Sequence, residues 1–211
     1  EGARAVKQAA IRQYGGTIID CAPTLAAREA TLADIVDRTG AHFVPPYDDD
    51  RVIAGQGTAM LELIEQVAGL DTVIAPVGGG GLLAGCAVVA REHKISVFGA
   101  EPEGADDAYR SFKSGVRVTS HVPKTIADGL QTTLGSRNFD IIRLHVDDIL
   151  LVPDSETIDA MRLLWTRTKL IVEPSAAVTL AAILRYPAQF VGKRVGVILS
   201  GGNVDPGDLP F

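Results

Sequence analysis

Four consecutive glycines, Gly78–Gly81, restrict what this chain can fold into more than any other stretch of its sequence. They follow an apolar run from Val73 to Val77, and a second apolar run from Leu82 to Ala90 comes after them. This order predicts a buried strand, a glycine loop and a buried helix. Glycine tolerates positive φ, so the loop can turn its N–H groups inward, and the helix N-terminus adds unpaired N–H groups. A phosphate-binding site is therefore predicted here, because a plain turn needs fewer glycines.

The kind of phosphate is a separate question, because the same loop fits a second pattern. Gly79 to Ala84 also reads G-x-G-x-x-A, and Glu101 stands 20 residues after Gly81 at the end of the next predicted strand. That is the dinucleotide fingerprint, in which the acidic residue binds a ribose hydroxyl. An NAD(P)-dependent oxidoreductase is thus an open alternative.

Composition excludes several classes of protein. The 211 residues are 46% hydrophobic, enough for one large or two small cores, and the net charge is −6 without a basic stripe, which argues against a nucleic-acid surface. The apolar runs are far shorter than the roughly 18 residues of a transmembrane helix, so no membrane partner is expected. Two cysteines, Cys21 and Cys86, are expected to be buried free thiols in a cytoplasmic protein. The four histidines show no metal-binding spacing.

The first 46 residues predict an αβαβ segment. A helix is expected over 3–14, a strand over 17–21, a helix capped by Thr24 that stops at Gly40, and a strand over 41–44. The chain begins with Glu1 and not Met, which indicates a piece of a longer protein. We expect residues 1–46 to belong to a small substrate-side domain.

Residues 47–211 are expected to belong to a larger cofactor-binding domain. The polar stretch 47–51 reads as a loop, with Thr58 as the N-cap of the helix behind it. Asp154 or Ser155 is expected to cap another long helix, and Glu173 precedes a further one. Strands are predicted over 95–100, 149–152 and 195–199.

Acidic residues cluster directly after the first of these strands. Four carboxylates occur within the seven residues from Glu101 to Asp107. Several oxygen donors close together suit a hard cation such as Mg²⁺ or Ca²⁺. The alternative is a solvated loop with an aspartate N-cap for a short helix near 106–112.

A second polar loop, Ser200–Asn203, follows the last predicted strand. Ligands of open α/β sheets bind beyond the carboxyl ends of the strands, where Gly78–Gly81 is also expected. The two loops could meet over one ligand, one holding a phosphate and the other a polar ring atom. Alternatively, Ser200 is only a turn residue.

Seven stretches carry most of the remaining information, and in chain order they are Val52–Thr58, Pro76–Gly85, Glu101–Asp107, Thr125–Gly129, Val146–Asp148, Glu173–Ser175 and Leu199–Asp205. Together, in this order and along nearly the whole chain, they resemble the serine/threonine dehydratase and serine racemase family of pyridoxal-phosphate enzymes. The resemblance implies an α/β protein of fold type II, the tryptophan-synthase β-like fold, with two open, parallel-rich sheets wrapped by helices. The chain resembles the C-terminal two-thirds of such an enzyme, with the N-terminal portion missing.

The resemblance also implies roles for individual residues. The glycine loop and the backbone of Leu82 would cradle the cofactor phosphate, and Ser200 would hydrogen-bond the pyridine nitrogen. Glu101, the carbonyl of Ala105 and Asp107 would bind a divalent cation (Mg²⁺, Ca²⁺ or Mn²⁺), which removes Glu101 from the ribose role. The glycine loop named here consists of Gly78, Gly79, Gly80 and Gly81.

Further positions match family sites on the substrate side. Arg28 would contact the substrate carboxylate. Lys7, Tyr14 and Asn203 match positions that line a nucleotide effector site in the racemase branch.

No catalytic residue is assigned within the chain. The family's Schiff-base lysine lies in a Ser-Phe-Lys motif expected upstream of Glu1. Ser111–Lys113 has the same letters but follows the glycine loop and reads as a surface helix end. The chain alone is therefore not expected to catalyse.

The predicted activity of the full-length protein is deamination of L-serine, L-threonine or a related 3-hydroxy amino acid to a 2-oxo acid and ammonia. Racemisation of serine or hydroxyaspartate is the alternative, and an NAD(P) oxidoreductase or a non-catalytic fragment are further ones. We expect a small amino-acid substrate, a possible nucleotide effector and a homodimer.

Overall fold

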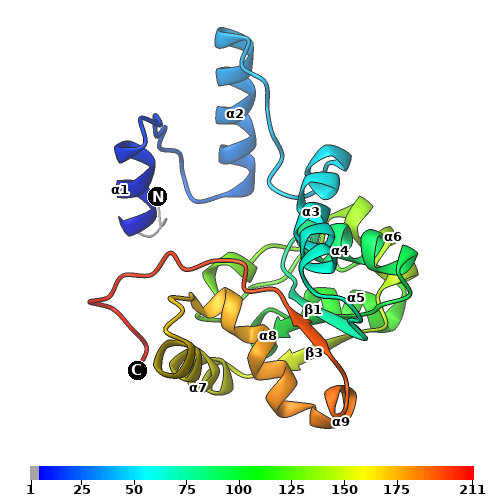
Figure 1. The fold of residues 1–211 in the computed structure, drawn as a ribbon. Coiled ribbons are helices and arrows are strands. Elements are labelled where there is room, and N and C mark those ends of the chain that lie inside the picture. The colour runs from blue at the N-terminus through cyan, green and yellow to red at the C-terminus, as the bar shows by residue number, and fades with distance from the viewer. Residues whose placement is uncertain (1–4) are drawn as a thin grey trace. The chain divides into compact units, whose positions relative to one another are not determined.

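The computed structural model describes residues 5–211, which form two compact units. The smaller unit comprises Glu1–Val44 and Asn203–Leu209, and the larger comprises Pro45–Gly202 and Pro210–Phe211. Figure 1 shows the course of the chain.

Two helices, α1 (Ala5–Gln13) and α2 (Leu25–Thr39), make up the regular structure of the smaller unit. Thr24 is the N-cap of α2, where its side-chain oxygen accepts a hydrogen bond from the Ala27 N–H at 3.2 Å. Gly40 ends the helix in the left-handed region, with its N–H donating to the carbonyl of Val36. The predicted cap and stop of this helix are confirmed.

The strands predicted over 17–21 and 41–44 are wrong, because residues 5–44 contain no strand. A strand is stable only where a neighbour pairs its N–H and C=O groups, and the described part of this unit offers no such neighbour. Apolar side chains of both segments stay exposed, by 50% at Ile19 and 66% at Val44. Of the two predicted sheets, residues 5–211 therefore contain one.

That sheet has four strands in the larger unit. They are β1 (Thr72–Pro76), β2 (Ser96–Pro102), β3 (Asp148–Val152) and β4 (Val195–Val197). Their order is β3-β2-β1-β4, and every neighbouring pair is parallel. The predicted strands of this unit are confirmed, and parallel pairing follows from the helical connections between them.

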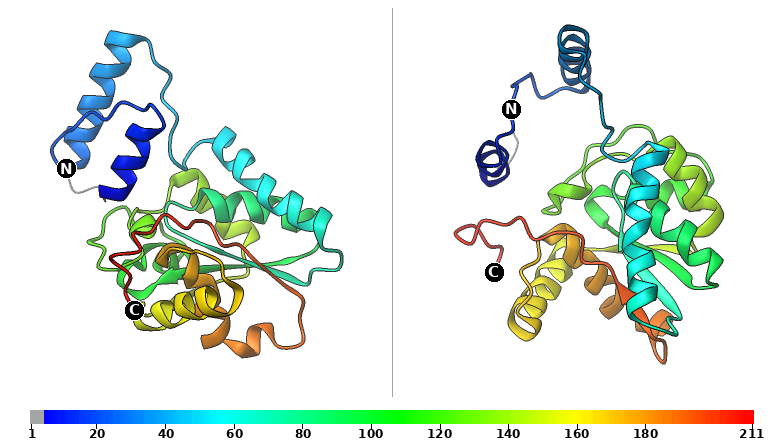
Figure 2. Two further views of the ribbon diagram at one scale, coloured as in Figure 1. Left: turned by 60° about the vertical axis from the view of Figure 1, so that its left-hand side comes forward. Right: turned by 45° about the horizontal axis from the view of Figure 1, so that its top comes forward.

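Helices cover both faces of the sheet (Figures 1 and 2). On one side of the sheet, α4 packs on β1 and β2, and α5 packs on β3. Helices α3 and α6 pack against α4. On the other side α8 contacts β1, β2 and β3, and α7 packs on α8. The bounds are α3 Asp50–Gln66, α4 Gly81–Glu92, α5 Asp107–Ser114, α6 Ser136–His145, α7 Asp154–Leu163, α8 Pro174–Arg185 and α9 Pro187–Phe190. A π-helical turn over Leu164–Thr168 continues α7, and short 3₁₀ turns lie at Glu103–Ala105 and Asp128–Leu130.

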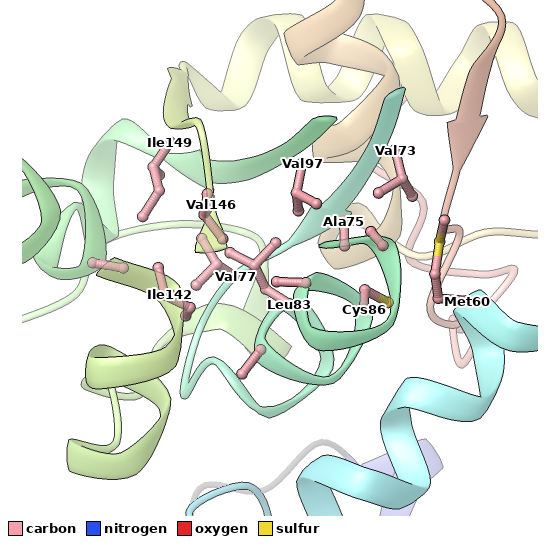
Figure 3. Packing of buried hydrophobic residues seen from close by; sticks show 14 of the residues in the cluster. Met60, Val73, Ala75, Val77, Leu83, Cys86, Val97, Ile142, Val146 and Ile149 are labelled. Carbon is pink, nitrogen blue, oxygen red and sulfur yellow. The ribbon is translucent and has the colours of Figure 1, made fainter. Parts of the chain in front are cut away.

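Alternate residues of β1 enter two different cores. Val73 and Ala75 belong to the core under α4, whereas Ile74 between them belongs to the core under α8. Figure 3 shows the first of these cores, in which Met60 of α3 and Cys86 of α4 belong to the same cluster as the strand residues Val73 and Ala75. Burial of both faces explains why the strands read as continuous apolar runs.

Two helix starts differ from those predicted. Helix α3 begins at Asp50 with Asp49 as N-cap, so Thr58 lies inside the helix, where its hydroxyl donates to the carbonyl of Gly55 at 2.7 Å. Pro153, and neither Asp154 nor Ser155, occupies the N-cap position of α7.

Helix α6 was not predicted, since its cap comes from far away in the sequence. The two carboxylate oxygens of Asp48 accept from the N–H groups of Ser136 and Arg137 at 3.1 and 3.0 Å. A cap supplied from 88 residues away leaves no local signal.

No helix within residues 5–211 has the length and apolar character that crossing a membrane requires.

Candidate functional site

The carboxyl edge of the parallel sheet gathers the residues on which the predicted site depends. Gly78–Gly81 follows β1, Glu101 lies near the end of β2, and Ser200 stands three residues beyond β4. Strands β1 and β4 are neighbours, and the N–H of Ile198 donates to the carbonyl of Ile74 at 3.0 Å beyond the end of β4. Parallel strands end at the same edge, so the glycine loop and Ser200 face the same side of the sheet.

All four loop glycines are buried. A Cβ on Gly79 would lie 2.3 Å from the ring of Tyr47, and one on Gly81 would lie 3.0 Å from the Tyr47 carbonyl oxygen. Gly80 has φ 92°, and its Cβ would lie 2.5 Å from Leu134 Cδ1. Neither the space nor the backbone conformation admits a side chain, so the loop requires glycine.

The backbone N–H groups of this loop have no acceptor among residues 5–211. The first hydrogen bond of α4 runs from the Ala84 N–H to the carbonyl of Gly80 at 2.8 Å. Within residues 5–211, no group accepts from the N–H of Gly78, Gly79, Gly80, Gly81 or Leu82. Buried N–H groups are costly without an acceptor, and a helix N-terminus favours an anion. The loop therefore fits a phosphate group.

Tyr47 forms one wall of the glycine loop and the 129–130 segment another. The Cβ position of Gly78 lies 3.0 Å from Leu130 Cα and 3.2 Å from the Gly129 carbonyl oxygen. The 125–129 segment is anchored at the same sheet edge, because Asp154 accepts from the Thr125 hydroxyl at 2.6 Å. Sequence reasoning missed Tyr47, since contacts between distant segments leave no pattern in the sequence.

Ser200 is exposed, so its hydroxyl is accessible to a ligand. The next residue is held in place, because the carbonyl of Gly201 accepts from the Glu173 N–H at 3.0 Å. The predicted bond from Ser200 to a ring nitrogen stays a prediction.

Glu101 is fully buried, which makes the solvated-loop alternative wrong for this residue. Its two carboxylate oxygens accept from the N–H groups of Ala108 and Tyr109 at 3.0 and 2.8 Å. Desolvation raises the pKa of Glu101 well above its usual range, against the lowering effect of these two bonds. Asp106 occupies the N-cap position of α5, as the alternative predicted, but its side chain makes no cap bond, and Glu101 accepts from the first-turn N–H groups instead. Because its side chain is fully buried, Glu101 cannot be reached by the ribose of a dinucleotide.

Asp107 is also fully buried, beside His121. One carboxylate oxygen accepts from the Leu134 N–H at 2.8 Å, while Oδ1 lies 3.5 Å from His121 Nε2 without a hydrogen bond. Desolvation raises the pKa of Asp107, opposed by the Leu134 bond and the nearby His121. A buried carboxylate oxygen without a hydrogen-bond partner suits a cation, but the described chain holds no cluster of three metal-binding side chains. The divalent cation therefore stays a prediction.

Both cysteines are free. Burial raises the pKa of the Cys86 thiol to about 12, so it remains a neutral core residue. Cys21 is only partly buried and lies outside any strand, contrary to the prediction.

The predicted substrate and effector residues belong to the smaller unit. Arg28 is exposed on α2, Lys7 lies on α1, and Tyr14 is 87% exposed just after α1. Asn203 begins the C-terminal segment of the same unit. Their roles remain predictions.

Lys113 lies away from the candidate site, as its sequence position predicts. Its ammonium group is 2.6 Å from Asp148 Oδ1, at the first residue of β3. That is the amino edge of the sheet, opposite the glycine loop.

Comparison with known proteins agrees with this geometry. A model of the pyridoxal-phosphate dependent enzyme family matches residues 1–201. The chain belongs to this family. Membership assigns pyridoxal phosphate to the protein and confirms the resemblance indicated by the motifs.

Individual pyridoxal-phosphate enzymes are similar over nearly the whole chain. A β-hydroxyaspartate dehydratase of Paracoccus denitrificans is 49% identical over 207 residues, which cover 97% of this chain and 66% of the relative. The serine racemase of Dictyostelium discoideum is 50% identical over 212 residues, covering 97% and 65%. This chain thus spans slightly less than two-thirds of these curated relatives.

Solved structures confirm the fold class. The crystal structure of the Dictyostelium discoideum serine racemase matches with a TM-score of 0.90 at 50% identity, covering 97% of this chain and 67% of that one. A maize serine racemase matches with a TM-score of 0.94 at 39% identity, covering 98% and 65%. The parallel sheet flanked by helices is therefore that of the fold type II pyridoxal-phosphate enzymes.

Proposed function

We propose that the complete protein containing this chain converts a 3-hydroxy amino acid, such as L-serine, L-threonine or 3-hydroxyaspartate, to a 2-oxo acid and ammonia. The β-hydroxyl leaves as water, and a water molecule is consumed when the released enamine hydrolyses. Relatives named as hydroxyaspartate dehydratase, hydroxyaspartate ammonia-lyase and threonine deaminase support this class of reaction.

One observation carries the proposal: a row of buried glycines at a helix N-terminus whose N–H groups have no acceptor within the described chain. In the proposal Gly78–Gly81 and Leu82 bind the cofactor phosphate through these groups. Pyridoxal phosphate, when bound, supplies an electron sink for chemistry at the amino-acid Cα. Tyr47 and Leu130 lie against the loop glycines and border the proposed phosphate site.

The Ser200 hydroxyl holds the ring nitrogen in this proposal. A neutral hydroxyl does not hold that nitrogen protonated as a carboxylate would. The weaker electron sink favours prompt loss of the β-hydroxyl.

The smaller unit serves the substrate in this proposal, with the Arg28 guanidinium binding its carboxylate. The lysine that forms the covalent link to the cofactor lies upstream of Glu1 and acts as the base at Cα. Glu101, the Ala105 carbonyl and Asp107 hold a divalent cation. Two further proposals are a nucleotide effector at Lys7, Tyr14 and Asn203 and a homodimeric protein.

Racemisation of serine is the second candidate, supported by the similarity to serine racemases. Racemisation and deamination both begin with removal of the proton at Cα. In racemisation a proton then returns to Cα on the opposite face, and the β-hydroxyl is kept. The chemistry of the glycine loop and Ser200 serves both reactions.

A product assay separates the two. The full-length protein would be incubated with L-serine, L-threonine and L-threo-3-hydroxyaspartate, followed by assays for 2-oxo acid, ammonia and D-amino acid. We expect 2-oxo acid and ammonia in equal amounts. D-serine as the main product would favour the second candidate, and neither product would contradict both.

A further inference from the structure

Asn138 places a buried side-chain amide against the glycine loop. The residue lies in the first turn of α6 and is completely buried. Its Nδ2 donates to the carbonyl of Gly79 at 2.7 Å and to that of Tyr47 at 3.2 Å. The Asn138 amide thus links the glycine loop to Tyr47, whose ring lies against the loop.

The other end of this amide is unsatisfied. Asn138 Oδ1 is buried and has no hydrogen-bond partner within the described residues. An unpartnered buried acceptor destabilises the fold, and an apolar side chain would avoid that cost. What the amide contributes here is therefore its donor end, which bonds to the carbonyls of Gly79 and Tyr47.

The Gly79 carbonyl accepts a second bond, from the Gly135 N–H at 3.0 Å. Two donors from the start of α6 thus fix the direction of this carbonyl. In a planar trans peptide the C=O and the following N–H point in opposite directions. The N–H of Gly80 is therefore aimed away from Asn138 and Gly135, and no described group accepts from it.

The element that carries Asn138 is itself tied to the wall of the loop. Asp48 accepts from the N–H groups of Ser136 and Arg137, and the adjacent Tyr47 ring lies against Gly79. Residues 47–48 and the start of α6 form one frame around the Gly79–Gly80 peptide.

We propose that Asn138 is a positioning residue, which holds the Gly79–Gly80 peptide so that the Gly80 N–H donates to the cofactor phosphate. The proposal rests on the proposed function, since it assumes that the phosphate of pyridoxal phosphate occupies the loop. It assigns to α6 a role that no motif in the sequence indicates.

Two nearly isosteric variants of the full-length protein test this role. In Asn138→Asp the carboxylate cannot donate to Gly79, and in Asn138→Leu a neutral side chain of similar size cannot donate either. The matched control is Thr157→Val, which removes one hydrogen bond of a fully buried side chain, to Pro153, on the distant helix α7. The measurements are the apparent Kd for pyridoxal phosphate and the ³¹P resonance of the bound phosphate.

We expect both Asn138 variants to bind pyridoxal phosphate about tenfold more weakly, with a shifted ³¹P resonance, and the control to match the wild type in both. Wild-type affinity and an unchanged resonance in both variants would overturn the positioning role while leaving the proposed function intact. A wild-type protein without affinity for pyridoxal phosphate would instead contradict the proposed function.

A measurement on the wild-type protein covers the case in which the variants do not fold. In ¹⁵N-labelled protein, adding pyridoxal phosphate should shift the Gly80 amide proton downfield, as for an N–H that donates to a phosphate. A Gly80 resonance that does not move while cofactor binds would overturn the proposal.

Discussion

At the scale of single residues, Gly80 has the most demanding backbone of the candidate site. Its φ of 92° is in the region that favours glycine, and a Cβ there would lie 2.5 Å from Leu134 Cδ1. Gly80→Ala should lower the free energy of unfolding by about 1–3 kcal/mol and weaken binding of pyridoxal phosphate. Urea unfolding and a cofactor titration measure the two effects. A variant with wild-type values in both would show that the loop does not need this conformation.

A second prediction concerns Ser200 and the course of the reaction. In Ser200→Asp a carboxylate beside the ring nitrogen would favour its protonated form and strengthen the electron sink. We expect the ratio of elimination to transamination to fall, and Ser200→Ala, which adds no charge, to keep it near the wild-type value. Product analysis with L-serine gives the ratio. An unchanged ratio in the aspartate variant would remove Ser200 from this role.

At the scale of elements, two glycines set the distance between α3 and α4. A Cβ on Gly85 would lie 2.4 Å from the carbonyl oxygen of Ile53 and 2.5 Å from the N of Gly57, so the two backbones are in contact. Because α4 begins at the glycine loop, this packing also positions the helix N-terminus that we propose binds the phosphate. A side chain at the crossing cannot be accommodated without moving one helix.

Gly85→Ala should therefore destabilise the protein by about 1–3 kcal/mol, since overpacking forces the backbone to shift. The matched control is Gly55→Ala in α3, where a Cβ would meet no atom within 4 Å. Removing a glycine from a helix interior there should stabilise the protein by about 0.5–1 kcal/mol. Urea unfolding of both variants should give opposite signs, and equal shifts would contradict the close crossing.

Elements with local signals could be predicted from the sequence, and elements stabilised from a distance could not. The buried strand β1, the loop behind it and α4 follow from one apolar–glycine–apolar pattern. Helix α6 depends on Asp48 for its cap, and the role of Gly57 inside α3 becomes clear only from its contact with Gly85 of α4. The predicted strands over 17–21 and 41–44 have apolar side chains, but the described chain provides no strand to pair with them.

The same distinction holds for the site. Gly78–Gly81 and Ser200 could be proposed from the sequence, since each follows a strand within a few residues. Tyr47 and Asn138 could not, because they reach Gly79 across 32 and 59 residues of chain. The position of Glu101 was predicted, while its burial and its bonds to α5 required the fold.

At the scale of the whole molecule, the glycine loop and Ser200, which we propose bind the cofactor phosphate and ring, lie at one edge of the sheet within residues 5–211. It spans about 65% of the relatives it matches, and its own Ser-Phe-Lys sequence lies at the opposite edge of that sheet. In the proposed function, the lysine that joins the cofactor therefore lies upstream of Glu1, and the activity is that of the full-length protein.

The most direct test is the absorbance spectrum of the full-length protein before and after borohydride reduction, followed by mass spectrometry of its peptides. The account predicts a visible band that disappears on reduction and leaves a cofactor-modified lysine upstream of Glu1. A colourless protein that binds NAD, or a cofactor attached to Lys113, would contradict it.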